Sequence, residues 1–461
     1  MRSRIPLTVA ALLASLLALS ACGDDGPDEG AGGSGAGGSS STSGAGGEAS
    51  GGGDTGGRGG EGGEGGGPAP FVPEPIPEIP DEVPEPCQAA IDSVYEFQFL
   101  DGVCGDKRWP TDEARDFACP TNDLGATIDL AGGGTATYQP PGEAPVFDTA
   151  ALAGLLPAGL RVTVILVRRV NGVPHYRYLS NGTHFETFQP WSSTKFLAAA
   201  NAAVRLRVAS GYEVGLTGKV GSLMLGDLVT ALVDYSYDPH SSNSLGRYFH
   251  DIGGRAAANA MIHEAWLGRP SVETFGGNYG EAAPALGYSF TDEGGASLSL
   301  TPDATSGPAN HLSTFTTAEA LKRLVLHRED AAGRLPGIQW KDIEVLLQGA
   351  EGSAKGPFGG LSADPAIYLQ TGHDIDYLEA RSHGRFRVYS KLGLGSAGQF
   401  LDTGYACFPV LDDEGEPVPG WGREFLISAQ LETGGSTWKQ RDRILATAYR
   451  TIVKRIIDGR I

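Results

Sequence analysis

From residue 147 onward, the spacing of apolar residues shifts between strand and helix periods. The run from Arg161 to Val170 is rich in β-branched residues, which is typical of a buried strand. Asn171-Gly172 marks a turn, and His175 to Leu179 predicts the hairpin partner of that strand. We expect a short helix that ends at Leu156 just before them. A sheet therefore begins early in this part of the chain.

Helical periodicity then takes over. The Ala- and Leu-rich residues from Trp191 to Val208 predict a helix, and further helical stretches lie at 223–235, 254–266, 317–327 and 341–347. Strand patterns return at 385–390, 403–410 and 424–431. The chain closes with a helix whose apolar positions share one face: Leu445, Ala448, Ile452 and Ile456.

This order of elements predicts the fold class. We expect an α/β (α+β) domain over residues 146–461, in which an antiparallel five-stranded sheet is flanked by helices. An all-helical domain is inserted after the second strand. More than 300 residues are enough to bury a substantial core.

The first 22 residues resemble an export signal. A short basic start precedes an apolar run from Ile5 to Leu19, which is too short to span a bilayer comfortably. Leu19-Ser20-Ala21-Cys22 resembles the bacterial lipobox, in which cleavage leaves an acylated N-terminal cysteine. The resemblance implies a lipid anchor at Cys22 and a place in the bacterial cell envelope, periplasmic or at the outer-membrane surface. Ordinary secretion with cleavage near Ala21 is the alternative.

Composition divides the next 120 or so residues into a linker and a module. Residues 23–67 are mostly Gly, Ser and Ala, and residues 68–86 are rich in Pro and Glu. Neither composition can bury enough apolar surface to offset chain entropy, so we predict a disordered linker over 23–86. Residues 87–145 hold three cysteines, turn signals and short alternating runs, which predict a small module.

The cysteines and the charge limit the classes of partner. With Cys22 assigned to lipid, Cys87, Cys104, Cys119 and Cys407 remain, and their three possible pairings stay open. A Cys407 that simply packs in the core is the alternative. The spacing of these residues is not that of a zinc site, so we expect no metal. A net charge of −20 argues against nucleic acid and against charge-driven adhesion to anionic lipid, and we expect a monomer.

Three short motifs fall where the predicted sheet meets the helical insertion. They are Ser192-Ser193-Thr194-Lys195, Ser241-Ser242-Asn243 and Lys391-Leu392-Gly393. In order and placement, over about residues 147–460, they resemble the S-x-x-K, S-x-N and K-T-G elements of class A β-lactamases and penicillin-binding proteins. One motif alone is not specific, because Ser436 to Lys439 also satisfies S-x-x-K. The resemblance implies a β-lactamase/transpeptidase-like fold.

The first motif has a direct chemical interpretation. Ser192 at the mouth of a helix and Lys195 one turn later share a face. A partly buried ammonium near a hydroxyl loses its proton readily, and the neutral amine can then take the proton of Ser192. The resemblance implies that Ser192 attacks a carbonyl carbon and forms an acyl-enzyme.

The other two motifs receive their roles from the same resemblance. Ser241 would pass a proton to the leaving nitrogen, and Asn243 would hold Lys195 and the substrate amide. Lys391 would offer a fixed positive charge to a substrate carboxylate, and Gly393 would let the substrate backbone lie close to the strand.

Two further features concern the substrate: the oxyanion hole and a departure from the family pattern at position 392. The oxyanion hole would consist of the backbone N–H groups of Ser192 and Leu394. Leu392 departs from the family pattern, because it replaces a hydroxyl residue that helps to bind a carboxylate. This departure puts recognition of a penicillin-like carboxylate in doubt.

Class A enzymes also use a loop glutamate to activate the water that releases the acyl group. Their E-x-x-L-N pattern is absent here. The stretch 268–316 offers Glu273, Glu281 and Glu293, each of which looks like a solvated loop acid, and Glu281 is the candidate base. Without a working base the acyl-enzyme would turn over slowly.

Together these features predict a serine hydrolase that needs no cofactor. Its substrate would be a β-lactam or a peptidoglycan stem peptide, as for a β-lactamase or a D-alanyl-D-alanine carboxypeptidase. The alternative is a catalytically degenerate envelope lipoprotein that uses the same fold as a binding or structural module.

Overall fold

The computed structural model describes residues 107–461 apart from 112, 114, 116–118, 120–124, 237, 308–309, 371–378, 396–398, 419, 421 and 433–437. These residues all belong to one unit of the chain, Ile76–Ile461. The predicted signal segment, the linker over 23–86, Cys22, Cys87 and Cys104 lie outside the described residues. Within the described part, no helix has the length and apolar character needed to cross a membrane.

A six-stranded sheet forms the centre of the described part, in the order β12-β13-β14-β4-β5-β3. Its strands are β3 Phe147–Asp148, β4 Leu160–Val170, β5 Val173–Ser180, β12 Arg387–Leu394, β13 Phe400–Phe408 and β14 Arg423–Leu431. Five of them pair antiparallel, as predicted, and the two-residue β3 adds a parallel edge beside β5.

The start of the domain differs from the prediction. Where a short helix was expected, Phe147 and Asp148 extend as β3 and residues 150–155 form turns. The Asp148 carboxylate still accepts the N–H groups of Ala150 and Ala151, as a helix cap would. The cap signal was therefore correct, but no helix follows it.

Local sequence explains the β4–β5 hairpin. Asn171 and Gly172 have φ values of 51° and 76°, and two left-handed residues in a row are what a tight hairpin turn requires. The register pairs Val170 with Val173 and carries both strands back across the sheet.

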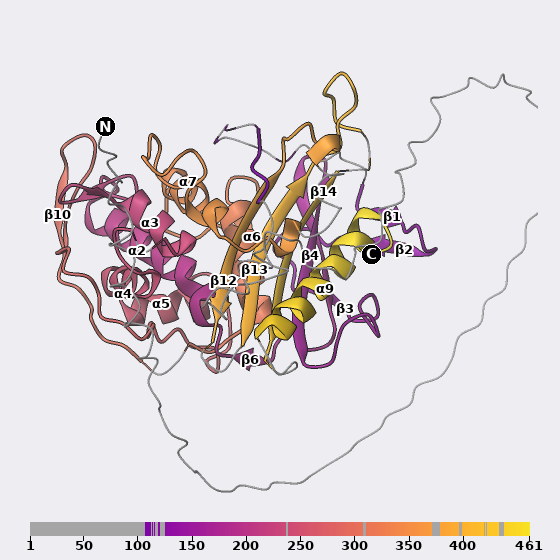
Figure 1. The fold of residues 1–461 in the computed structure, drawn as a ribbon, viewed down its shortest axis with the longest axis horizontal. Coiled ribbons are helices and arrows are strands. Elements are labelled where there is room, and N and C mark those ends of the chain that lie inside the picture. The colour runs from indigo at the N-terminus through magenta and orange to yellow at the C-terminus, as the bar shows by residue number, and fades with distance from the viewer. Residues whose placement is uncertain are drawn as a thin grey trace, which may run out of the picture. The chain divides into compact units, whose positions relative to one another are not determined.

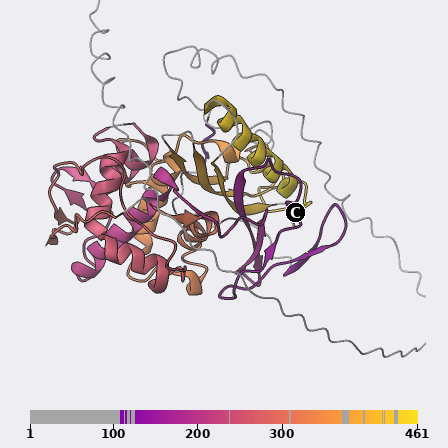
Figure 2. The same cartoon turned by 90° about the horizontal axis from the view of Figure 1, so that it is seen from below.

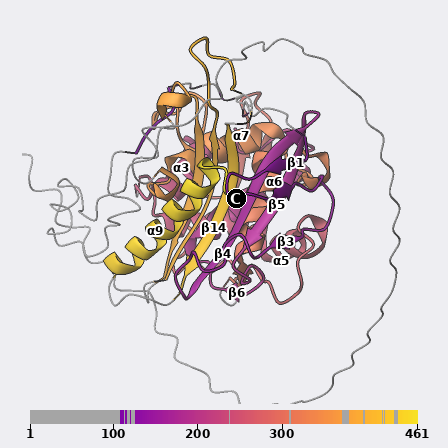
Figure 3. The ribbon, with the colours of Figure 1, turned by 90° about the vertical axis from the view of Figure 1, so that its right-hand side faces the viewer.

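Helices cover both faces of the sheet. Helix α9, Trp438–Ile457, lies across β14 and β13 on one face (Figure 3). Its predicted apolar face is buried, including Leu445 and Ile452. Helix α6, Thr314–Val325, packs against β4, β13 and β14 on the other face (Figure 1). The predicted fold class is confirmed.

The helical insertion lies beside β12, on the side of the sheet away from α9 (Figure 2). It contains α2 Lys195–Ala209, α3 Leu225–Asp234, α4 Ser242–Gly253, α5 Arg255–Ala260 with a π-helical turn Met261–Ala265, and α7 Trp340–Gln348. Short strands tie its loops: β7 Lys219–Val220, β8 Leu223–Met224, β9 Ser289–Thr291 and β10 Ser297–Ser299 form one sheet, and β6 Thr187–Phe188 pairs with β11 Leu312–Ser313.

Helix α4 was not predicted. Ser241 is the N-cap of α4, and its hydroxyl accepts the Ser244 N–H. The second motif thus begins a helix, and α4 packs directly on α2.

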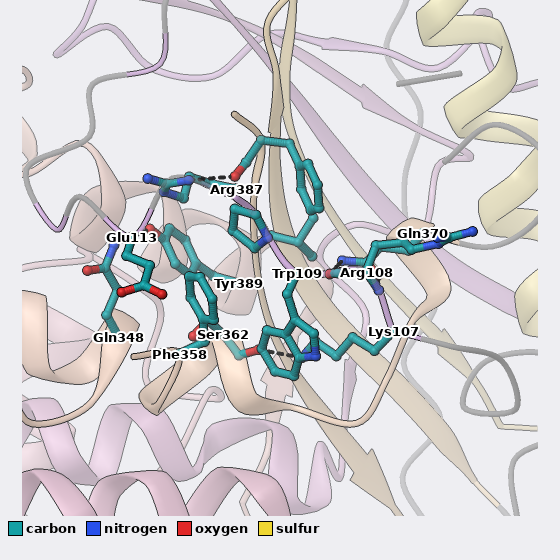
Figure 4. Close-up of a pocket in the computed structure, with 13 residues that line it drawn as sticks. Lys107, Arg108, Trp109, Glu113, Gln348, Phe358, Ser362, Gln370, Arg387 and Tyr389 are labelled. Carbon is teal, nitrogen blue, oxygen red and sulfur yellow. Dashed lines mark hydrogen bonds between the residues drawn. The ribbon is translucent and has the colours of Figure 1, made fainter. Parts of the chain in front are cut away.

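Residues between 107 and 145 pack on the large domain. The hairpin β1 Thr127–Asp129 with β2 Thr135–Thr137 precedes β3, and a disulfide joins Cys119 to Cys407 of β13. A stretch near residue 109 runs beside the start of β12, where Trp109 stacks on Phe358 and lines a small pocket (Figure 4). Among the pairs that the sequence left open, the structure shows Cys119–Cys407.

Candidate active site

Ser192 lies in a tight turn where the sheet meets the helical insertion. It belongs to the 3-10 helix η1, Trp191–Thr194, which continues directly into α2 and packs against β12. The side chain of Ser192 is partly exposed, and its carbonyl accepts the N–H of Lys195. Trp191 is left-handed, with φ of 49°, which is costly for an aromatic residue. A strained backbone thus presents Ser192 at the end of β12.

Gly393 allows this close approach. A Cβ atom at Gly393 would lie 2.7 Å from the carbonyl oxygen of Pro190 and 2.8 Å from the nitrogen of Ser193. Both contacts are with backbone atoms of η1 or its flank, which cannot swing aside as a flexible side chain can. The space of the missing side chain is therefore occupied by backbone atoms at η1.

Lys195 is the most deeply buried group of the first motif, with 0% of its surface exposed. Its ammonium nitrogen lies 2.9 Å from the Ser242 hydroxyl and 2.7 Å from the side-chain oxygen of Asn243. Burial holds the pKa of Lys195 well below its usual value, and the charge of Lys391 lowers it further, whereas Glu281 opposes the shift. Burial therefore favours the uncharged form of the Lys195 amine.

Ser241 and Glu281 form a contact of their own. The Ser241 hydroxyl lies 3.0 Å from the Ser244 hydroxyl and donates to the exposed carboxylate of Glu281. The role expected for Ser241 requires its hydroxyl at the leaving nitrogen, next to the lysines. Its hydrogen bonds in the structure are to the first turn of α4 and to Glu281.

The other two glutamates of the long loop have different environments. Glu293 is exposed. Glu273 is 1% exposed, lies 2.9 Å from Arg269, and accepts the N–H of Ser313 at 3.1 Å. The expectation that Glu273 is a solvated loop acid was wrong. Its buried carboxylate joins the two ends of the 268–316 stretch, through an ion pair with Arg269 and a hydrogen bond from Ser313. The i, i+4 spacing from Arg269 was the available signal.

Lys391 is also completely buried. Its ammonium donates to the Tyr235 hydroxyl at 2.7 Å and to the carbonyl of Leu392 at 2.9 Å, and lies 3.7 Å from the carboxylate of Asp364. Burial lowers the pKa of Lys391 to about 8 against the attraction of Asp364 and Asp402. Lys391 thus remains mostly charged at neutral pH, and the phenol of Tyr235 covers its ammonium.

Sequence reasoning missed the partners of Lys391. Tyr235 carries no motif and reaches the lysine because of its position at the C-terminal end of α3. Asp364 accepts the N–H of Leu392 at 2.6 Å, and Asp402 lies opposite Leu392 in the sheet register. Single acids such as Asp402 inside an apolar strand were the signal that could have identified this cluster.

The protonation of Asp402 follows from its surroundings. It is 0% exposed, and burial, together with the charge of Asp364, raises its pKa to about 8. Asp402 is therefore mostly neutral at pH 7, and the carboxylate of Asp364 lies 3.7 Å from the Lys391 ammonium.

Proteins similar to this chain were found among solved structures. No protein-family model matches the sequence, and no curated protein matches it. Among solved structures, a class A β-lactamase of the last common ancestor of Gram-negative bacteria is 18% identical, with 64% of this chain and 94% of that chain covered and a TM-score of 0.37. A β-lactamase from Burkholderia vietnamiensis is 14% identical, with 66% and 94% covered and a TM-score of 0.36. With identities and TM-scores this low, the chemistry must be inferred from the side chains of the site itself.

The raised pKa of Asp402 predicts a pH-dependent stability. Between its ordinary pKa of 3.8 and about 8, the folded protein keeps a proton that the unfolded chain has lost, so the free energy of unfolding falls as pH rises. Asp402→Asn does not titrate and should lose less stability than the wild type between pH 5 and pH 8. Urea unfolding at both pH values measures this, with the exposed Asp413→Asn as the control. Equal pH slopes in wild type and Asp402→Asn would contradict the assignment.

Proposed function

We propose that the protein is a serine hydrolase of the class A β-lactamase-like family, acting through an acyl-enzyme at Ser192. Its substrate would be the amide of a β-lactam or of a peptidoglycan stem peptide. The observation that carries the proposal is the completely buried amine of Lys195, which Asn243 holds at 2.7 Å one turn after Ser192, and whose pKa is lowered by burial. A neutral amine at this position is a base for the serine hydroxyl.

Acylation would proceed with these groups as follows. Lys195 takes the proton of Ser192 as Oγ bonds to the carbonyl carbon, and the carbon–nitrogen bond of the amide then breaks. The backbone N–H groups of Ser192 and Leu394 would stabilise the oxyanion. Support for this pairing comes from Gly393, which brings the end of β12 against η1.

Release of the acyl group would use Glu281. Its carboxylate bonds to Ser241, and its charge acts on Lys195, so it lies within the electrostatic reach of the site. A carboxylate placed there can accept a proton from the water that attacks the ester.

A second candidate function is a binding or structural module of the envelope. It is favoured by the same cluster at Lys391, where Tyr235 covers the ammonium and Leu392 replaces the expected hydroxyl residue. In that case the fold would be retained without turnover.

Intact mass after incubation with a fluorescent penicillin separates the two functions. We expect a covalent adduct on the wild type and none on Ser192→Ala, because the acyl group bonds to Oγ. Ser436→Ala is the matched control, since Ser436 begins the other S-x-x-K sequence in the chain. An unmodified wild type, or an adduct that persists in Ser192→Ala, would favour the binding module.

The role of Glu281 predicts a change in the lifetime of that adduct. Glu281→Gln should still be acylated but should release the acyl group about 10²-fold more slowly, which is a typical loss for a general base. Glu293→Gln, from the same loop, is the exposed control. Decay of the adduct in a chase with unlabelled penicillin measures the rate. An unchanged lifetime would remove Glu281 from deacylation.

We further propose that Cys22 anchors the protein to a membrane of the cell envelope through acyl chains. Leu19-Ser20-Ala21-Cys22 and the linker that follows support the proposal. Radiolabelled palmitate should enter the wild type and be absent from Cys22→Ser, because the thiol is the attachment point. Equal labelling of the two proteins would show that the label is attached elsewhere.

A further inference from the structure

Tyr235 covers the buried ammonium of Lys391. Its hydroxyl accepts from Lys391 at 2.7 Å and donates to the carbonyl of Leu392 at 2.8 Å. The phenol therefore bridges the end of α3 and the edge of the sheet. Lys391 itself has no exposed surface, whereas Tyr235 is partly exposed.

The backbone of Tyr235 is held in an unfavourable conformation. Its φ of 55° and ψ of 23° are left-handed, a region that a bulky residue rarely adopts. The flanking residues are fastened: Asp234 accepts the Ser236 N–H at 2.8 Å, and Lys355 bonds to the Ser236 hydroxyl at 3.0 Å. The surrounding structure thus directs this particular side chain at Lys391.

Tyr235 also lies between the two lysines. The centre of its ring is 4.0 Å from the Lys391 nitrogen and 5.8 Å from the Lys195 nitrogen. Ser241, which the motif comparison made the proton donor, bonds to Ser244 and Glu281.

We propose that Tyr235 is the proton donor to the leaving nitrogen and that Lys391 acts through it. This inference rests on the proposed acylation of Ser192. As the carbon–nitrogen bond breaks, the hydrogen that Tyr235 now donates to Leu392 turns to the nitrogen, and the Lys391 ammonium replaces it on the phenol oxygen. The proton that Lys195 took from Ser192 then passes to Lys391. In the sum, Ser192 has lost one proton, the leaving nitrogen has gained one, and both lysines and Tyr235 are as they began.

The test compares acylation rates by a fluorescent penicillin. Tyr235→Phe keeps the ring and removes the hydroxyl, and we expect acylation to slow by about 10²-fold, as for loss of a general acid. Tyr288→Phe is the matched control, because its hydroxyl bonds to Asp251 outside this cluster. Ser241→Ala should slow acylation less than Tyr235→Phe does.

The pH profile separates this role from a structural one. The charged or titratable groups that face Lys391 are Tyr235, Asp234, Lys195, Asp364 and Asp402. In Tyr235→Phe the ammonium loses an acceptor, so the alkaline limb of the acylation profile should move to lower pH. A rate within about threefold of wild type, an unmoved limb, or a larger loss in Ser241→Ala would overturn the inference. If the wild type itself forms no adduct at Ser192, the proposed function fails first, whereas an acylated wild type with an unaffected Tyr235→Phe refutes the role of Tyr235 alone.

Discussion

Two lysine side chains are completely buried in one seam between the sheet and the helical insertion, and this burial lowers the pKa of both. In a medium of low dielectric, neighbouring ammonium groups cannot both keep their charge cheaply. Lys391 has Asp364 at 3.7 Å, whereas the hydrogen-bond partners of Lys195 are the neutral side chains of Ser242 and Asn243. The charge of Lys391 accordingly lowers the pKa of Lys195 further, whereas Asp364 counteracts the effect of burial on Lys391. The two lysines thus differ because their partners differ.

The fold contributes mainly by bringing the seam together. Gly393 lets β12 touch η1, and Trp191 absorbs backbone strain at the point of contact. Capping of α4 by Ser241 fixes the first turn of that helix, which directs Asn243 at Lys195. Each of these features involves only a few residues, but it brings together segments that are far apart in the chain. The disulfide Cys119–Cys407 ties the preceding part of the chain to the same sheet.

How far the sequence reaches depends on the range of each interaction. The β4–β5 hairpin and the buried face of α9 were predictable, because alternation, turn residues and helical period are local properties. The sequence also supplied Ser192, Lys195 and Asn243, since fixed spacing within a motif survives without knowledge of the fold.

Tyr235 and Asp402 were not predictable, because their roles depend on long-range packing and not on spacing. A tyrosine at a helix end and an acid inside a strand acquire meaning once β12 is placed beside α3. Glu273 was misassigned for a related reason. Its loop is long and polar, yet the two ends of that loop meet in a buried place, where the carboxylate of Glu273 pairs with Arg269.

Strand geometry connects the departure at Leu392 to the behaviour of Lys391. Alternation along β12 places Lys391 and Gly393 toward the helical insertion, and Leu392 in the core beneath α9, beside Phe400 and Leu445. Leu392 lies opposite Asp402, a buried polar side chain of the same layer, and adds no further polar group to it. On the other face of the strand, the phenol of Tyr235 accepts from the Lys391 ammonium. The two faces of β12 thus have different surroundings: Leu392 belongs to the core under α9, and Lys391 meets the residue that ends α3.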